Sequence, residues 1–516
     1  MCIRDSKKTS FAIEASDATG DTKTLWTSPK GNKGWNEVEV SLDEYQGHAI
    51  RLDFISEGDL ATSGWGQPAL YVPTSKESEE QAPTPPKNII MVVLDTTRAD
   101  AFAPFYPNTD VQTPFMDEVI KHGTSFKNTY NNENWTKPST ATIMSGLYST
   151  THTARRAESI LPKEVRLFSE HLQGQGFYTG FMTSNAVLSD KFGFNKGWDT
   201  FTNYARTPYG NGKYLYQNAA KWLEERPDPS KRFFLYIQSV DAHTTYEVPA
   251  KYSGKYFKGK YNGKLGQNFD REEQVEADKG ALKLSETDLN WVKAMYKGEI
   301  TYQDEQLGIL LKKIKELGLD EDTMIVITND HGEELKEHGH MDHGWTLYDE
   351  MIRAPLVFSF PKGIKTNHVI KDVFEHVDLA PTLSAVLDVE MMGSAEGQNL
   401  MPLLTGQTPH FLPLYAVSAS RNKIRTIRVG DWKLFVGASK NRMFLFNIKK
   451  DPLEKNNVLK ENPIAARLCE IYLGEALASP NKKTRLQNMR SARSIPSTDA
   501  TIDEETRKEL EALGYL

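Results

Sequence analysis

The chain has 516 residues, of which 39% are hydrophobic and 25% are charged, and its formal net charge is −7. These proportions are ordinary for a globular protein of about three domains. The mild acidic balance argues against a general nucleic-acid binder, which would carry a basic stripe, and the two cysteines, Cys2 and Cys469, fit no metal-binding spacing.

Residues 1–72 are expected to form an accessory, β-sandwich-like domain. The runs WNEVEVSLDEY and AIRLDFISEG alternate polar and apolar residues with a period of two, and clusters of Gly, Asn and Asp separate such runs. Trp35 and Trp65 either stack on sugars, as in a carbohydrate-binding module, or belong to the core of this domain, and we prefer the core. The start, MCIRDSKKTS, lacks the apolar stretch of a secretory signal. Strand-like sequence follows it at once, which is compatible with a truncated domain.

Residues 73–87 form a linker rich in Pro, Ser and Glu, and a catalytic α/β domain is predicted over 88–405. Strand-like runs are found at 89–94, 177–183, 232–239, 324–328 and 355–360. Helix-like runs are found at 114–122, 164–174, 214–225, 286–317 and 377–388. This alternation predicts a doubly wound, mostly parallel sheet, in which ligands bind beyond the carboxyl ends of the strands. No apolar run reaches the roughly 18 residues of a membrane span.

Residues 406–516 are expected to form a smaller C-terminal subdomain. The short apolar runs LYAVSA, KIRTIRVG, WKLFVG and MFLFNI follow one another closely, and a helical stretch comes next at 463–478. Short strands at such close spacing indicate an antiparallel sheet, and the helix is expected to pack on it.

Two predicted strands end in acidic residues. Asp95 ends MVVLD, and Asp330 and His331 follow VITN; the loop after them holds further histidines, so that residues 330–343 contain four of the twelve histidines. A histidine-rich loop at a strand end indicates a metal or phosphoryl site. On composition alone, a polar surface loop remains an open alternative.

A third segment, WTKPSTATIM, carries a hydroxyl just ahead of a predicted helix. Pro138 is suited to the first turn of that helix, which places Thr136 at a helix N-terminus, where an anion is favoured. A hydroxyl there becomes a nucleophile if a metal stabilises its alkoxide. The alternative is that Thr136 only caps the helix.

The succession of these motifs resembles the sulfatase family, within the alkaline phosphatase superfamily, over about residues 88–460. The motifs, in this order, are LDTTRAD, TPFMDEVIKHGTSFKNTY, WTKPSTATIMSGLYSTTH, DAHTTY, YKGEITYQDEQLGILLKKI, TNDHGEELKEHG, LYDEMIRAPLVF, HVDLAPTLSAVL and FLFNIKKDPLEKNN. The resemblance implies a doubly wound α/β domain with a smaller C-terminal sheet domain, and an enzyme that hydrolyses a sulfate or phosphate ester. It also implies a periplasmic or secreted protein.

The resemblance further implies one divalent metal ion. Its ligands are Asp95, Asp330, His331 and the oxygen of Thr136, which stands at the nucleophile position of the family pattern. Because an imidazole accompanies the carboxylates, we expect zinc or manganese rather than an all-oxygen calcium site.

Four further residues match or neighbour the family's substrate-contacting positions. His243, in DAHTTY, matches a histidine that contacts substrate, and His343 matches a histidine near the leaving group. Lys137 and Lys336 are the candidate cations for binding an anionic small-molecule, glycan-linked or lipid-linked ester.

Two departures from the family pattern alter the expected chemistry. Thr136 cannot become formylglycine, which family members make from cysteine or serine, and Thr140 replaces an anion-binding arginine. A threonyl sulfate lacks the exit that formylglycine provides, so we favour a phosphate mono- or diester and a covalent threonyl intermediate. The alternatives are a phosphoglycerol- or phosphoethanolamine-type transferase, and a non-catalytic glycan-binding protein with a decayed sulfatase domain.

Overall fold

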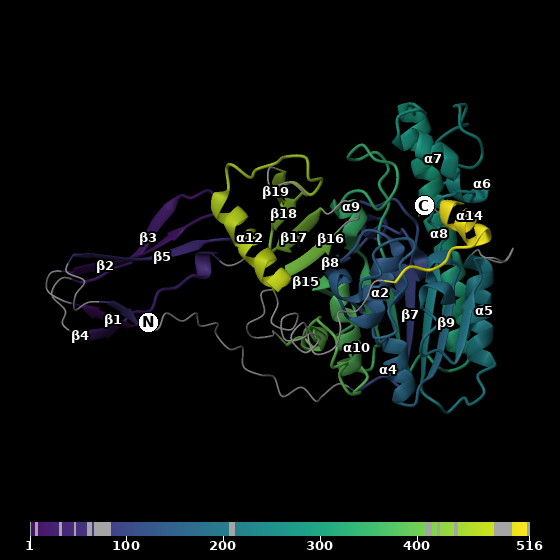
Figure 1. Cartoon of the computed structure of the whole chain (residues 1–516), viewed down its shortest axis with the longest axis horizontal. Coiled ribbons are helices and arrows are strands. Elements are labelled where there is room, and N and C mark those ends of the chain that lie inside the picture. Colours follow the sequence, from purple (N-terminus) through teal and green to yellow (C-terminus); the bar gives the residue numbers. More distant parts are fainter. Residues whose placement is uncertain are drawn as a thin grey trace. The chain divides into compact units, whose positions relative to one another are not determined.

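A computed structural model gives the fold of the chain. It describes residues 2–5, 9–29, 34–45, 48–58, 64–66, 84–205, 212–407, 415–419, 424–437, 442–478 and 498–512. The chain divides into two compact units (Figure 1). The first comprises 1–80, 410–415 and 426–478, and the second comprises 81–409, 416–425 and 479–516. Among the described residues, no helix has both the length and the apolar character that crossing a membrane requires.

The second unit is built on a nine-stranded sheet in the order β10-β9-β11-β7-β12-β14-β8-β13, with β15 beside β8. Its strands are β7 (Asn88–Leu94), β8 (Thr124–Tyr130), β9 (Tyr178–Thr183), β10 (Thr200–Asn203), β11 (Phe233–Ser239), β12 (Thr323–Thr328), β13 (Arg353–Ala354), β14 (Leu356–Ser359) and β15 (His368–Glu375). The strands from β10 to β12 are parallel, and β14 pairs antiparallel with β12 and with β8. Every residue of β7 is buried, as expected for a central strand covered on both faces.

Helices cover both faces of this sheet. The α-helices of the unit are α1 (Pro114–Lys121), α2 (Thr136–Ser145), α3 (Ser149–His152), α4 (Phe168–Gly174), α5 (Gly212–Glu224), α6 (Ala250–Ser253), α7 (Arg271–Asp278), α8 (Glu286–Glu316), α9 (Asp349–Ile352), α10 (Leu379–Val386), α11 (Met401–Leu404) and α14 (Glu504–Ala512). Short 3₁₀ turns are η3 (Ala99–Ala101), η4 (Ala186–Leu188), η5 (Asp190–Phe192) and η6 (His376–Asp378). Figure 1 shows α2 and α4 on one side of β7 and β9, and α5 on the other.

The main core lies between the sheet and the helices α1, α5 and α8. Alternate residues of β7 point into it, among them Ile90 and Val92, because successive side chains of a strand face opposite ways. The long helix α8 adds Val292 and Met295 to this core, and Ser285 starts it with a capping box that satisfies its first amides. The sheet is therefore held from both faces, and its strand ends are fixed in position.

The first unit contains small antiparallel sheets. Near the N-terminus, β1 (Cys2–Asp5), β4 (Gly34–Glu37) and β6 (Gly64–Gly66) form one three-stranded sheet, and β2 (Thr9–Ser16), β3 (Thr22–Thr27) and β5 (Arg51–Gly58) form another. The ring of Trp65 lies edge-on to Phe11, with centroids 5.1 Å apart, and to Phe54, with centroids 5.4 Å apart. Trp65 thus packs with the core of this domain, and the side chain of Trp35 lies outside the described residues.

The C-terminal part of the first unit is a small antiparallel sheet with a helix. The strands β17 (Arg425–Val429), β18 (Trp432–Val436) and β19 (Met443–Asn447) belong to this sheet, and α12 (Pro463–Ala478) contacts β18. The strand β16 (Tyr415–Ala419) lies almost wholly in the second unit. The large mixed, mostly parallel sheet and the small N- and C-terminal antiparallel sheets confirm the predicted fold class.

Candidate active site

The carboxyl ends of four neighbouring parallel strands meet at one edge of the large sheet. Asp95 directly follows β7, and Asp330 and His331 follow shortly after β12. Asn185 comes just after β9, and Gln238 is the last residue but one of β11. All five side chains are completely buried. Because parallel strands bring their carboxyl ends to the same edge, residues far apart in the sequence meet where α/β proteins bind ligands.

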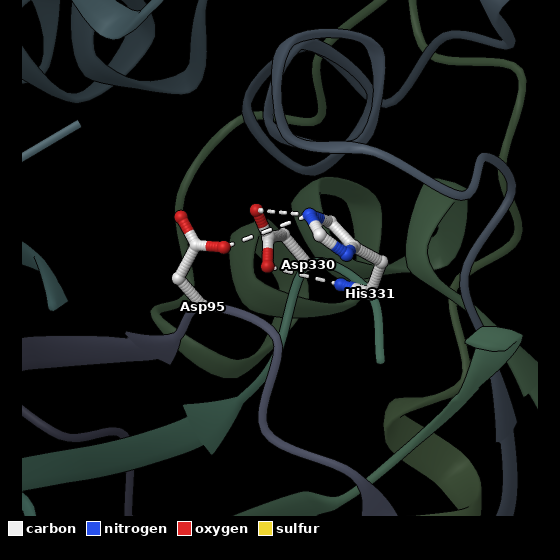
Figure 2. Close-up of side chains that lie close together, drawn as sticks. All are labelled: Asp95, Asp330 and His331. Carbon is white, nitrogen blue, oxygen red and sulfur yellow. Dashed lines mark hydrogen bonds and ion pairs between the residues drawn. The ribbon is translucent and has the colours of Figure 1, made fainter. Parts of the chain in front are cut away.

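Asp95, Asp330 and His331 form the centre of the site (Figure 2). The Nε2 atom of His331 is 3.6 Å from Oδ1 of Asp95 and 3.6 Å from Oδ2 of Asp330. One ligand atom from each residue lies within 4.8 Å of the other two. Among the described residues, Oδ1 of Asp95 has no hydrogen-bond partner although it is buried. An orphaned carboxylate oxygen that faces an imidazole fits a divalent cation at this point, as the sequence predicts.

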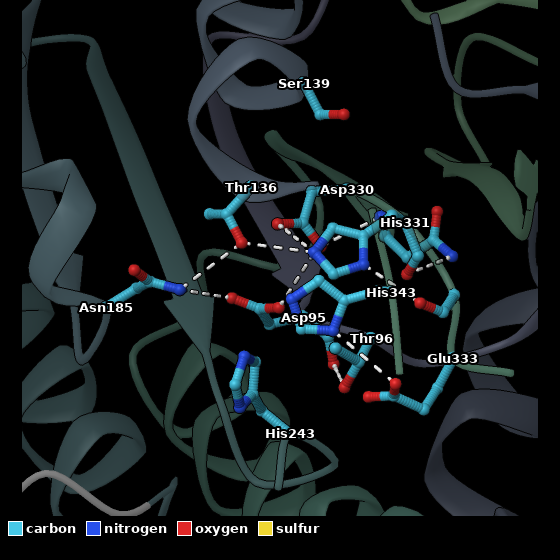
Figure 3. A network of polar contacts seen from close by, with 12 residues as sticks. Asp95, Thr96, Thr136, Ser139, Asn185, His243, Asp330, His331, Glu333 and His343 are labelled. Atoms are coloured by element: carbon cyan, nitrogen blue, oxygen red, sulfur yellow. Dashed lines mark hydrogen bonds and ion pairs between the residues drawn. The ribbon is translucent and has the colours of Figure 1, made fainter. Parts of the chain in front are cut away.

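The Thr136 hydroxyl lies against this trio (Figure 3). Its Oγ1 atom is 3.1 Å from Nε2 of His331, and Nδ2 of Asn185 donates to it over 3.4 Å. The same Nδ2 donates to Oδ2 of Asp95 over 2.8 Å. Thr136 is the first residue of α2, and the N-cap position is held by Trp135. The hydroxyl therefore faces the carboxylates and the imidazole, where the nucleophile hypothesis needs it.

Burial perturbs the acid–base behaviour of the three central residues. Burial, together with the neighbouring Asp330 carboxylate, raises the pKa of Asp95 to about 6. Burial raises the pKa of Asp330 to about 7. Burial, followed by the nearby His343 ring, lowers the pKa of His331 to about 4. Burial thus opposes ionisation of the two carboxylates and protonation of the imidazole, and a bound cation would favour the ionised carboxylates.

Two further histidines stand beside the trio. The His343 ring lies with its centroid 4.5 Å from that of His331 and 5.0 Å from that of His243. Burial, followed by the His343 ring, lowers the pKa of His243 to about 4. Nδ1 of His243 lies 2.8 Å from the carbonyl oxygen of Thr244. The structure therefore brings His243 and His343, which are far apart in the sequence, to the same side of the predicted metal ligands.

His343 is bordered by two carboxylates. Its Nδ1 atom is 3.5 Å from Oε1 of Glu333 and 3.3 Å from Oδ1 of Asp342. Nη2 of Arg271, on α7, donates to Oδ2 of Asp342 over 2.9 Å. Helix α7 thus contacts the loop that carries His343 through this ion pair.

The two candidate lysines make main-chain contacts. Nζ of Lys137 donates to the carbonyl oxygens of Ala157 and Ser159, and lies 3.4 Å from the centroid of the Phe192 ring. Nζ of Lys336 donates to the carbonyl oxygens of Ala277 and Gly339, over 2.7 and 3.0 Å. A role of either lysine in substrate binding stays a prediction.

Asn185 and Gln238 are absent from the sequence-based prediction of the site. Nε2 of Gln238 donates to Oδ2 of Asp330 over 2.9 Å and to Oδ2 of Asp95 over 3.3 Å. Each amide sits at or just beyond the end of an apolar strand, in GFMTSN and LYIQS. A polar side chain at the carboxyl end of a buried parallel strand was the available signal, because such a side chain needs a partner.

Comparisons with known proteins identify relatives of this chain. A family model described as Sulfatase matches residues 87–389, and a second, described as N-sulphoglucosamine sulphohydrolase, C-terminal, matches residues 336–474. The chain is similar to N-acetylglucosamine-6-O-sulfatase of Bacteroides thetaiotaomicron, with 23% identity covering 82% of this chain and 92% of that protein.

Two solved structures share the fold. One, in complex with its substrate D-glucosamine-2-N,6-O-disulfate, has a TM-score of 0.63 and 22% identity, covering 77% of this chain and 99% of the other. Phosphonate monoester hydrolase of Agrobacterium radiobacter has a TM-score of 0.61 and 20% identity, covering 79% and 96%. Since the first family model spans more than half of the chain, the chain belongs to the sulfatase family of the alkaline phosphatase superfamily and is a hydrolase acting on sulfuric ester bonds.

Proposed function

We propose that this sulfatase-family enzyme cleaves a sulfate ester carried by a carbohydrate, with Thr136 as the nucleophile. The observation that carries the proposal is the position of the Thr136 hydroxyl, 3.1 Å from Nε2 of His331. At this position a divalent cation bound by the neighbouring imidazole and carboxylates would stabilise the alkoxide of Thr136, as a nucleophile requires.

The residues for that cation are Asp95, Asp330 and His331, with the Thr136 oxygen as a fourth donor. A divalent cation bound there supplies Lewis-acid chemistry, lowering the pKa of the hydroxyl and polarising the ester. The mixture of imidazole and carboxylate donors suits zinc or manganese better than calcium. Asn185 holds both Asp95 and the Thr136 hydroxyl through one nitrogen, so the nucleophile and a metal ligand keep a fixed distance.

The chain's own residues then define two steps. In the first step the Thr136 hydroxyl gives its proton to water, its oxygen attacks the sulfur, the bond from sulfur to the leaving oxygen breaks, and the leaving alcohol takes up a proton from His343. His243 is the weaker candidate for this proton, because burial lowers its pKa to about 4. In the second step a water oxygen joins the sulfur, the bond to Thr136 breaks, one water proton returns to Thr136 and the other to His343, and sulfate leaves. Both histidines border the site, and the contacts of His343 with Glu333 and Asp342 keep its ring in place.

A carbohydrate substrate is supported by the relatives. One relative is named N-acetylglucosamine-6-O-sulfatase, and one structure with the same fold is bound to its substrate, a disulfated glucosamine. A second candidate is a phosphodiester or another phosphate ester, which a hydroxyl nucleophile favours, because a threonyl sulfate cannot collapse as a hemiacetal does. Transfer to an acceptor alcohol is the remaining alternative.

One panel of assays tests the proposal. The protein, loaded with Zn²⁺ or Mn²⁺, is offered 4-nitrophenyl sulfate, glucosamine 6-sulfate, bis(4-nitrophenyl) phosphate, 4-nitrophenyl phosphate and phenyl phosphonate. We expect turnover of the sulfate esters, and we expect Thr136→Ala to lower kcat by about a thousandfold or more, since a nucleophile acts in the transition state. Adding an acceptor alcohol and measuring its sulfated product separates transfer from hydrolysis.

A matched control is available on the same helix. Ser139 is buried on α2 like Thr136, but its hydroxyl donates to the carbonyl oxygen of Glu133. Ser139→Ala is expected to keep kcat within a few-fold, while Thr136→Ser keeps a hydroxyl and a measurable rate. If Thr136→Ala retained near-normal turnover, Thr136 would not be the nucleophile, and turnover by a protein free of bound metal would rule out the metal-assisted mechanism.

A further inference from the structure

Gln238 lies between the two predicted carboxylate ligands. Its Nε2 atom donates to Oδ2 of Asp330 over 2.9 Å and to Oδ2 of Asp95 over 3.3 Å, and its side chain is completely buried. A single neutral amide group thus contacts both carboxylates at once. Since the two negative charges repel each other in a buried site, a shared donor keeps them close together.

Hydrogen bonds to the oxygen of this amide fix its orientation. Its oxygen, Oε1, accepts hydrogen bonds from the hydroxyl of Tyr236 over 2.6 Å and from Oγ1 of Thr140 over 3.2 Å. A reversed amide would turn its oxygen toward two carboxylate oxygens, which cannot donate to it. The two hydroxyls therefore keep the NH₂ group facing Asp95 and Asp330.

The amides also select which oxygen of Asp95 remains for a cation. Oδ2 of Asp95 accepts from Gln238 and from Asn185, whereas Oδ1 has no hydrogen-bond partner among the described residues and lies 3.6 Å from Nε2 of His331. Oδ1 of Asp330 accepts from the backbone nitrogen of His331 over 3.0 Å, and Oδ2, which accepts from Gln238, is the oxygen that lies 3.6 Å from Nε2 of His331. Hydrogen bonds thus fix both carboxylates and leave Oδ1 of Asp95 facing the imidazole nitrogen.

We propose that Gln238 is the positioning residue that presets Asp95 and Asp330 to receive the divalent cation, and that Thr140 and Tyr236 fix its direction. Thr140 lies four residues after Thr136 on α2, so both hydroxyls lie on the same face of the helix. The helix that carries the proposed nucleophile therefore also orients the metal ligands. The inference rests on the metal site of the proposed function.

Metal affinity, measured without substrate, tests this inference. Full-length protein stripped with a chelator is titrated with Mn²⁺ alone, and Kd is obtained by competition with a metal-sensitive dye. We expect Gln238→Leu to raise Kd by about 10- to 100-fold, the effect usual for a residue that orients metal ligands. Thr140→Val together with Tyr236→Phe removes both orienting hydroxyls and should approach the effect of Gln238→Leu.

Gln303 provides the matched control. It is also a buried glutamine of the second unit, and its oxygen accepts from Thr97 while its nitrogen donates to Ser239. Gln303→Leu removes the same chemical group and is expected to leave Kd for Mn²⁺ within about twofold. The rise in Tm that Mn²⁺ causes should shrink for Gln238→Leu and persist for Gln303→Leu, because only the first weakens binding to the folded state.

The outcomes separate the inference from the proposed function. If Gln238→Leu binds Mn²⁺ as tightly as the unchanged chain, or if Gln303→Leu weakens binding equally, Gln238 has no positioning role. A chain that binds no Mn²⁺ at all also overturns the inference. If metal binding follows the expected order while no ester is cleaved, the inference stands and the proposed reaction fails.

Discussion

Lowering the pH from 8 to 5 is expected to weaken the binding of a divalent metal by roughly a thousandfold, through protons that occupy its carboxylate ligands. In the metal-free site, burial raises the pKa of Asp330 to about 7 and of Asp95 to about 6. Only the ionised carboxylates bind the cation. The affinity should therefore be close to its full value at pH 8 and should fall as the pH drops through 7 and then 6.

The size of the expected change in metal affinity follows from how far the pKa of each carboxyl group lies above 5. A group with a pKa of about 7 is ionised in about one molecule in a hundred at pH 5, and one with a pKa of about 6 in about one in ten. His331 adds little, because burial lowers its pKa to about 4 and its ring stays neutral over this range. A thousandfold change in Kd corresponds to about 4 kcal/mol. The two carboxylates are coupled, so the two steps belong to the pair.

Isothermal titration with Mn²⁺ across this pH range measures both the affinity and the protons released. Below pH 6 the slope of log Kd against pH should approach two protons per metal. Asp330→Asn removes the group with the higher pKa, and its limiting slope should fall to one proton. An affinity that stays constant between pH 8 and 5.5, or that falls only near pH 4 as for ordinary carboxyl groups, would refute this reasoning.

Two more changes probe other parts of the chain. His343→Gln is expected to lower kcat by roughly 10²- to 10⁴-fold for alkyl sulfates, which need a proton on the leaving oxygen, and much less for 4-nitrophenyl sulfate; equal losses on both substrates would exclude a general-acid role. In the C-terminal sheet, Nζ of Lys433 lies 2.9 Å from Oε1 of Glu454, and both side chains are completely buried. Lys433→Met should reduce the free energy of unfolding by about 3–5 kcal/mol, as a buried ion pair that loses one partner does. In denaturant unfolding, Lys433→Met with Glu454→Leu should recover much of that loss, and a double variant as unstable as the single one would contradict it.

The central strands and the long helix could be predicted because their local pattern and their tertiary role coincide. The runs at 89–94 and 286–317 match β7 and α8 closely, since both are long, strongly apolar on the buried side and bounded by clear signals. By contrast, the sequence pattern did not predict the strands β8 and β15. Their sequences, TSFKNTY and HVIKDVFE, mix charged and apolar residues, because these strands lie toward one edge of the sheet and are held by their neighbours.

That the three central residues of the site lie together was predictable for a related reason, whereas their role as metal ligands is implied by the family resemblance and stays a prediction. Asp95, Asp330 and His331 each follow an apolar strand that the sequence clearly predicts. The carboxyl ends of parallel strands lie at the same edge of a sheet, so these positions come together. Lys137 shows that a residue next to a site residue in the sequence can point elsewhere in the structure. Consecutive residues of a helix point about 100° apart, and Nζ of Lys137 reaches the carbonyl oxygens of Ala157 and Ser159. Arg271 and Asp342 are 71 positions apart in the sequence, and no local sequence pattern predicts their contact.

The charge of the site bears on which ester it accepts. Two ionised carboxylates balance a divalent cation, and burial lowers the pKa of His243 and of His331 to about 4, so both rings are neutral near pH 7. A sulfate ester or a phosphodiester brings one negative charge, whereas a phosphate monoester approaches two. An additional buried charge without a partner costs several kcal/mol. Among the phosphate esters the diester therefore suits this site better than the monoester, and the singly charged sulfate ester of the family meets the same condition. Faster turnover of 4-nitrophenyl phosphate than of either singly charged ester would mean that a further cation, supplied by His343 or a lysine, faces the substrate.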